Sequence, residues 1–407
     1  KLRQMEQEYG KLNQTIQRTN KTVDQSGDFF GKAATKLMSY LGIFGGFFLI
    51  RQKLTEAFSA NLQYADSLTN IQKTTQMTTE EIHLLANELK YVDTRSAVSE
   101  LNDLAYAAGK LGIKGVDNVM GFVRAADQIK IALGEQLGDS SQAVEQIYKI
   151  TNIMGTADQY GLEESLTRTG SSINYLTMMS QASAQPMVDF MKRTAGISHQ
   201  AGMSAAELTG WAGAVAALGQ PVEMSATSIS KMMVQISSKS KVVAAALKMT
   251  NEELEAFRYD VAAGRMSDAL MTVLRKVNEA GGLSHLGTIV KDLGSEGQRV
   301  VQTIATLASG YETVERMVRM SNEAFDEGTS VINEYNLKNQ NAAAMWEKLK
   351  KEFSKMWVSP ENVEMAKEFI EALKPLPGTL KQIISLVGPI AKFFGSFFFG
   401  MRTVVVF

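Results

Sequence analysis

The stretch 203–221, MSAAELTGWAGAVAALGQP, holds one helix together with the signals that start and stop it. Ser204 precedes Glu207 by three residues, which is the spacing of a capping box: the hydroxyl accepts a hydrogen bond from the third helical amide, and the Glu side chain reaches back. Gly219-Gln220-Pro221 ends the helix, because proline has no amide donor and clashes with a preceding turn. This stretch predicts a helix between residues 204 and 219.

Two kinds of side chain line the predicted helix. One stripe, at 3-4-3 spacing, consists of Leu208, Trp211, Val215 and Leu218. Beside it lie small residues, namely Gly210, Gly213, Ala214 and Ala217. A stripe of this kind is the apolar face of a packed helix, and small residues let a neighbouring backbone come close. We therefore expect core packing here, with another helix in close approach.

Similar signals for the start and end of helices recur through residues 55–335. Thr78 with Glu81 and Thr250 with Glu253 fit the capping box again. Helix breaks are predicted at Gly112–Gly115, Gly155, Gly170, Gly202 and Gly281–Gly282. Only residues 403–407 have a strand-like composition. The fold class predicted for the chain is all-α, with a multi-helix core of short packed helices at 55–335.

A longer stripe follows near the end of this core. Its members recur at 4-3-4-3-4 spacing and are Val300, Ile304, Leu307, Tyr311, Val314 and Val318. The spacing predicts one long packed helix. A further stripe of Trp346, Leu349, Phe353 and Met356 predicts an amphipathic helix beyond the core.

Residues 1–54 form a separate N-terminal part. Apolar positions repeat with the heptad period of a coiled coil, and the seam that we predict for self-association contains Leu2, Met5, Tyr9, Leu12, Ile16 and Val23. The alternative is an amphipathic helix that docks on its own chain. The uncharged segment Leu37–Ile50 has fourteen residues, which is short of the roughly 20 needed to span a bilayer.

Residues 336–407 form the third part, with amphipathic helices that lead into an apolar segment. Ile383–Met401 is rich in phenylalanine and is interrupted by Pro389 and Lys392. We assign a membrane contact as one use of this segment, through Phe393, Phe394, Phe397, Phe398 and Phe399.

Composition narrows the class of protein. The chain of 407 residues is 45% hydrophobic and 21% charged, as expected of a folded protein. Its net charge of −1 gives no sign of specific nucleic-acid recognition. Cysteine is absent, which excludes disulfides and cysteine-based sites. Because the chain opens without methionine and ends in the apolar run Val404–Phe407, we expect it to be an excerpt of a longer polypeptide.

No motif predicts catalysis, and we expect no catalytic residue, cofactor or metal ion. The histidines His83, His199 and His285 stand far apart and in no metal-binding pattern. The turn Gly294–Gly297 lacks the lysine of a phosphate-binding loop, and acidic pairs such as Glu252-Glu253 suit the first turn of a helix.

Several stretches, in order, resemble the core region of the phage tail tape measure, or minor tail, protein family. The first is Ala107–Ile113 with the helix through Phe122 and Ile129, and the second is Met203–Gly219 followed by Pro221. The third runs from Met266 through Val277 to Leu293–Gly297, where Leu293 replaces a common aromatic residue. Asn341–Trp357 resembles the helix that follows the core.

This resemblance implies a structural tape measure protein. Such proteins lie in the lumen of the tail tube, set tube length during assembly in the host cytoplasm, and leave during genome ejection. The implied partners are the tail tube protein, tail assembly chaperones and baseplate or tail-tip proteins. A homo-oligomer and contact with the host envelope are further expectations.

Two other interpretations stay open. A membrane-active, pore-forming helical protein is motivated by Leu37–Ile50 and Ile383–Met401. An enzyme is the other, since some tape measure proteins carry lytic domains elsewhere in the chain.

Overall fold

The computed structural model describes residues 63–138, 140–279 and 297–341, together with 286–287, 289, 343–345, 347–348 and 351. All regular secondary structure in these residues is helical, and the all-α prediction is confirmed. Residues from Tyr64 to Met356 belong to one compact unit. The predicted division into 1–54, 55–335 and 336–407 stays a prediction.

The described helices follow one another with short connections. Residues 63–75 are helical. The helices that follow are α4 (Thr79–Tyr91), α5 (Val98–Lys110), α6 (Val116–Leu133), α7 (Ser140–Ile153), α8 (Thr156–Tyr160), α9 (Leu162–Met179), α10 (Ala184–Gln200), α11 (Ala205–Ala217), α12 (Val222–Ala246), α13 (Asn251–Ala262), α14 (Met266–Glu279), α16 (Gly297–Ser309), α17 (Tyr311–Glu327) and α18 (Ser330–Asn339), with a short 3₁₀ turn at Gly134–Gln136.

The three predicted capping boxes are all present. At the start of α11, the Glu207 amide donates to Ser204 Oγ over 3.1 Å, and the Ser204 amide donates to Glu207 Oε2 over 2.8 Å. Thr78 with Glu81 and Thr250 with Glu253 form the same reciprocal pair. Each box satisfies two amides that a helix end leaves without partners, so the sequence alone positioned these starts.

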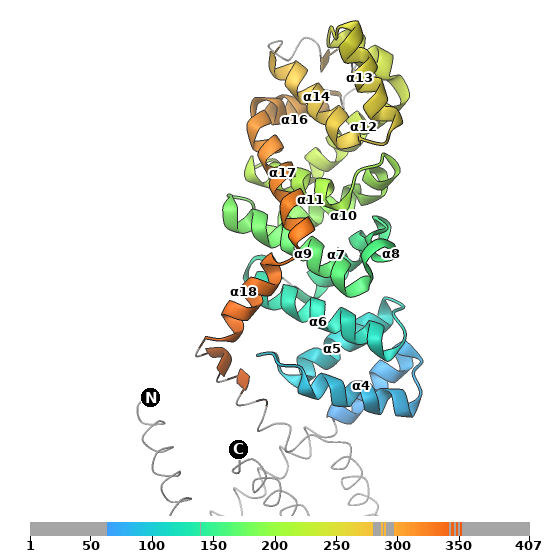
Figure 1. Ribbon diagram of the computed structural model, residues 1–407, viewed down its shortest axis with the longest axis vertical. Coiled ribbons are helices and arrows are strands. Elements are labelled where there is room, and N and C mark those ends of the chain that lie inside the picture. The colour runs from blue at the N-terminus through green and yellow to red at the C-terminus, as the bar shows by residue number, and fades with distance from the viewer. Residues whose placement is uncertain are drawn as a thin grey trace, which may run out of the picture. The chain divides into compact units, whose positions relative to one another are not determined.

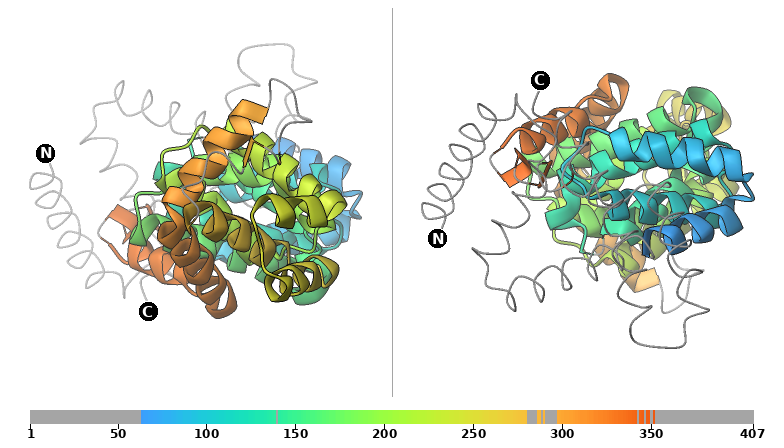
Figure 2. Two further views of the ribbon diagram at one scale, coloured as in Figure 1. Left: turned by 90° about the horizontal axis from the view of Figure 1, so that it is seen from above. Right: turned by 90° about the horizontal axis from the view of Figure 1, so that it is seen from below.

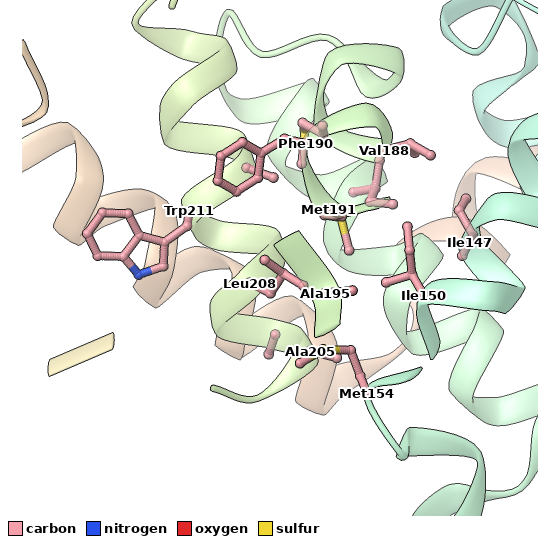
Figure 3. Packing of buried hydrophobic residues seen from close by; sticks show 14 of the residues in the cluster. Ile147, Ile150, Met154, Val188, Phe190, Met191, Ala195, Ala205, Leu208 and Trp211 are labelled. Carbon is pink, nitrogen blue, oxygen red and sulfur yellow. The ribbon is translucent and has the colours of Figure 1, made fainter. Parts of the chain in front are cut away.

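Helix α11 is the most enclosed element of the unit. Leu208, Trp211 and Val215 are fully buried, as the stripe predicted. Leu208 and Ala205 face Met191 and Ala195 of α10, while Trp211 extends to the other side (Figure 3). The indole Nε1 of Trp211 donates a 3.0 Å hydrogen bond to Ser267 Oγ, so this large buried side chain leaves no polar atom unpaired.

The small residues of α11 allow the predicted close approach. A Cβ placed on Gly210 would lie 2.5 Å from Val318 Cα, so the backbones of α11 and α17 touch there. On Gly213 a Cβ would lie 2.7 Å from Leu176 Cδ1 of α9. Figure 1 shows α17 alongside α11, with α9 below them, and Figure 2 shows the orange C-terminal helices beside the green ones in both views. The small residues therefore let α11 pack closely against two helices.

The long helix predicted from the stripe 300–318 is wrong. The chain leaves helical geometry at Gly310, with φ −97° and ψ 24°, and forms α16 and α17 instead. A Cβ on Gly310 would lie 2.8 Å from Leu218 Cδ1, so glycine lets this turn lie against the end of α11. Helix α16 packs on α12 and α14, whereas α17 packs on α11 and α9. The apolar residues of this one stripe are thus divided between two helices that pack against different neighbours.

The helix break predicted at Gly170 is also wrong. Gly170 lies inside α9 and is buried. A Cβ there would lie 2.8 Å from Ile129 Cγ1 of α6, so this glycine is needed for close packing. The three breaks predicted at Gly112–Gly115, Gly155 and Gly202 are confirmed, and the glycines at these breaks have positive φ. The break predicted at Gly281–Gly282 lies outside the described residues. Helix α12 consists of two helical segments that meet at a kink at Lys239, where φ is −134° and ψ is 38°.

The contact between α11 and α17 yields a stability prediction. Gly210→Ala should lower the free energy of unfolding by about 1–3 kcal/mol or more, because its methyl group meets backbone atoms that cannot rotate away. Chemical denaturation of the two proteins measures the difference. Gly196→Ala is the matched control: it lies in α10 with open space around its Cβ position, and it should raise stability by about 0.5–1 kcal/mol. Equal effects of the two substitutions would contradict the close packing.

Candidate functional site

Hydrogen bonds between residues far apart in the sequence collect along one line of the unit. They join α17 and residues 330–351 to α9, to the start of α11 and to the loop 92–96, which connects α4 and α5. We call this set of contacts the polar seam, and we call the described residues from Ser330 to Lys351 the strap. The strap consists of α18 and the described positions after it.

The first part of the polar seam is made by buried serines. Ser172 Oγ on α9 donates to the Ser321 carbonyl over 2.8 Å, and Ser321 Oγ donates to the Ala206 carbonyl over 2.6 Å. The Val331 amide, at the start of α18, donates to Ser171 Oγ over 3.2 Å. The three serines are fully buried. Because buried hydroxyls are costly unless they are paired, these bonds fix how α17 and α18 lie on α9.

The second part surrounds the turn between α17 and α18. Nη1 of Arg168 donates to the carbonyls of Phe325 and Asp326 over 3.0 and 2.8 Å, and its guanidinium also pairs with Glu164 Oε1 at 2.7 Å. These carbonyls lie in the last turn of α17, where carbonyls lack helical partners and a cation is favourable. The next residue after the helix, Gly328, has φ +64°, which suits glycine. Arg168 therefore holds the end of α17 in place.

The third part connects the strap to the loop 92–96. The Tyr335 hydroxyl donates to the Asp93 carbonyl over 2.8 Å. Asn339 forms two bonds, since its Oδ1 accepts from the Arg95 amide over 2.8 Å and its Nδ2 donates to the Asp93 carbonyl over 3.2 Å. The Lys351 ammonium donates to the Val92 carbonyl over 2.7 Å. The strap thus binds the backbone of this loop through its own side chains.

A buried carboxyl group lies behind this loop. Asp127 of α6 is 1% exposed; Ser96 Oγ donates to its Oδ1 over 2.5 Å, and its Oδ2 has no hydrogen-bond partner among the described residues. Burial raises the pKa of Asp127, and the hydroxyls of Ser96 and Thr94 and the ammonium groups of Lys351 and Lys130 offset part of that effect. Burial likewise raises the pKa of Tyr335, to about 12.

The polar seam holds α18 on the unit through few buried side chains and several hydrogen bonds. On α18 only Val331, Tyr335 and Asn339 are buried. Each buried apolar side chain contributes about 1.5–3 kcal/mol to stability, and each hydrogen bond contributes about 0.5–1.5 kcal/mol after exchange with water.

Two clefts lie near the polar seam, with volumes of about 620 and 500 Å³, and the smaller is lined by Glu88, Met120, Arg124 and Tyr335 among others. In the described part of the chain, no group of three or more metal-ligating side chains could hold a metal ion.

Comparison with known proteins gives a match over about three quarters of the chain. The sequence model of one family, described as phage-related minor tail protein, matches residues 79–383. The chain belongs to this family. It follows that this minor tail protein has a structural role in a phage tail, is part of the virion and contacts other tail components. No curated protein and no solved structure matched the chain.

The site residues predicted from the sequence of this minor tail protein lie outside the described residues. They are the seam residues Leu2, Met5, Tyr9, Leu12, Ile16 and Val23, and the membrane-contact residues Phe393, Phe394, Phe397, Phe398 and Phe399. The stripe of Trp346, Leu349, Phe353 and Met356 also lies outside them. These predictions stay predictions, as does the pore-forming alternative. No helix among the residues with described structure is long and apolar enough to cross a membrane.

The histidines that are described take no part in the polar seam. His83 is exposed on α4, His199 is exposed near the end of α10, and His285 is outside the described residues. Sequence reasoning missed the polar seam itself. Its signal was present in the polar and small residues 167–174 and in the asparagine-rich segment 330–341, neither of which has a clear apolar face. Residue type could not identify their partners, which lie more than 140 positions away along the chain.

The buried carboxyl of Asp127 yields a prediction on pH dependence. A carboxyl whose pKa is raised in the folded protein contributes stability that is present below its unfolded pKa and is lost as pH rises through the folded pKa. Asparagine cannot ionise, so Asp127→Asn removes the loss of stability that ionisation of the buried carboxyl causes. Its amide oxygen can still accept the hydrogen bond from Ser96 Oγ. The stability of the variant relative to the unsubstituted chain should therefore increase as pH rises from about 3 to 7.

Urea unfolding of both proteins at a series of pH values measures this dependence. Asp117→Asn is the control for loss of one negative charge from α6, since Asp117 is exposed at the start of the same helix. If the stability difference between Asp127→Asn and the unsubstituted chain does not change with pH, the conclusion that burial raises the pKa of Asp127 is contradicted.

Proposed function

We propose that this chain is the tape measure protein of a phage tail, which lies in the lumen of the tail tube, templates the length of the tube and leaves during genome ejection. The observation that carries the proposal is the match to the phage-related minor tail protein family over residues 79–383. The helical class of the described residues is compatible with that role.

The compact unit is the folded core in this proposal, and the length-setting sequence lies outside residues 64–356. In that unit, helices turn back and pack on one another, so its length does not grow in proportion to the number of residues. A ruler needs extended helix, whose length does grow in that way. The heptad repeat at 1–54 then serves self-association.

The proposed partners follow from the same role. They are the tail tube protein around the chain, the tail assembly chaperones in the host cytoplasm, and the baseplate or tail-tip proteins at the end of the tube. A second copy of the chain binds through the heptad positions, and the segment with Phe393–Phe399 contacts the host envelope on ejection. Specific nucleic-acid recognition is not part of this function.

Tail length tests the proposal directly. In the phage, an in-frame deletion of about 70 residues of the proposed length-setting sequence, encoded outside 64–356, should shorten tails by about 100 Å. A duplication of the same segment should lengthen them equally, because a ruler made of helix rises about 1.5 Å per residue. Electron microscopy of the particles measures tail length. A phage with Gly196→Ala is the control and should keep its tail length, since that site is in open space on α10. Tails of unchanged length in both the deletion and the duplication would refute the proposal.

We further propose that this chain has no enzymatic activity of its own. The sequence offers no recognised catalytic motif, and the polar seam binds backbone carbonyls. Purified chain incubated with bacterial cell wall should release no soluble fragments above the buffer blank. Release of such fragments, when a boiled sample gives none, would contradict this.

A further inference from the structure

We propose that the strap, which is α18 and the described positions after it up to Lys351, detaches from the unit as one piece while the other described helices stay folded. The motion is a rotation about Gly328 and Thr329, and it uncovers the faces of α6 and α9 that α18 covers. The inference concerns the order in which the chain opens and does not depend on where the protein acts.

The hinge is defined by what is held on either side of it. Before it, α17 is fixed by the contact between Gly210 and Val318 and by Arg168, whose guanidinium binds the last carbonyls of the helix. At Gly328 the chain adopts a left-handed conformation and leaves the helix. A few backbone angles between two rigid helices are enough to absorb a large rotation. The strap can therefore leave without disturbing α17.

The strap is fastened differently from the rest of the core. Helix α11 buries ten of its residues and α9 also buries ten, whereas α18 buries three. Large apolar side chains of the strap face solvent, with Leu337 at 68% and Met345 at 63% exposure. A segment with few buried apolar contacts opens at a lower free energy than the core around it. The strap should therefore open at a lower free energy than α9 and α11, the helices that it is fastened to or lies beside.

The groups that detachment frees can be hydrated. In the loop 92–96 they are the carbonyls of Val92 and Asp93, the Asp93 carboxylate and the amide of Arg95. On the helices they are the hydroxyl of Ser171 and the side-chain amide of Asn174 in α9, and the carbonyl of Ala132 in α6. None of these bonds belongs to the internal ladder of a helix, so α6 and α9 keep their backbone hydrogen bonds when the strap leaves. Water can replace the strap at these polar groups, so the main cost of detachment is the exposure of Val331 and Tyr335.

The physical consequence, if the proposed tape measure role holds, is an order of release. Chain that follows the strap pulls on α18 first, and the bonds of Asn339 and Tyr335 to the loop 92–96 are loaded one after another. The body opens only after the strap has left. The detachment itself is a property of the isolated chain, so its failure can be told apart from a failure of the tail-length prediction.

Thiol labelling tests the detachment, because the chain contains no cysteine and a single introduced thiol is the only one present. Ser171→Cys places a thiol beneath the start of α18, where Ser171 Oγ accepts from the Val331 amide. Ser228→Cys is the matched control, since Ser228 is also buried and its Oγ accepts from Thr303 Oγ1 of α16. In native buffer, labelling at residue 171 should be about 100-fold faster than at residue 228, as expected for local opening below the global unfolding free energy. Equal rates would overturn the proposal.

Asn339→Ala shows whether the strap controls that opening. It removes both bonds between Asn339 and the loop, and it should accelerate labelling at residue 171 about 10-fold without changing the rate at residue 228. Asn333→Ala, at an exposed position of the same helix, should change neither rate. Acceleration of both thiols alike by Asn339→Ala would mean that the chain opens only as a whole, and would overturn the proposal.

Hydrogen exchange of the unsubstituted 407-residue chain gives an answer that does not depend on the folding of any variant. Amides of α18, at 331–339, should exchange well before those of α9 and α11. Exchange of the three helices at one common rate would overturn the proposal as well.

Discussion

The close approach of α17 to α11 at Gly210 is the contact on which the rest of the unit depends. Helix α11 is buried on nearly all sides, and the absence of side chains at Gly210 and Gly213 lets its neighbours approach unusually closely. Through these positions α11 contacts both α17 and α9. The turn at Gly310 then directs α16 to other partners, so residues far apart in the sequence share one core.

Polar groups determine how the end of the unit attaches to that core. The buried hydrogen bonds of Ser171, Ser172 and Ser321 are directional, so each is satisfied in only one relative arrangement of the helices. Apolar contacts alone would permit several arrangements. Such bonds give a defined arrangement with modest net stability, since water competes for the same groups. A defined arrangement with modest net stability suits the strap, which we propose is bound to the unit in the folded chain and detaches from it before the core unfolds.

Membership of the phage-related minor tail protein family places the chain in a virion, where a structural protein works through its shape and its contacts. A compact helical unit with a polar-fastened end fits such a role. The Asp127 carboxyl beneath the strap is compatible with it: burial raises its pKa, so the charged form gains when water enters.

The sequence by itself determined the helical class, the three capping boxes, the buried stripe of α11 and the family resemblance, because each depends on residues within a few turns of one another. Only the tertiary structure decided that Gly170 packs inside a helix, that Gly310 divides a continuous stripe and that Asn339 binds the loop 92–96. A glycine permits a turn and a close contact equally well, and an asparagine can bond to any exposed backbone group. Which of these occurs depends on what the folded chain brings beside it.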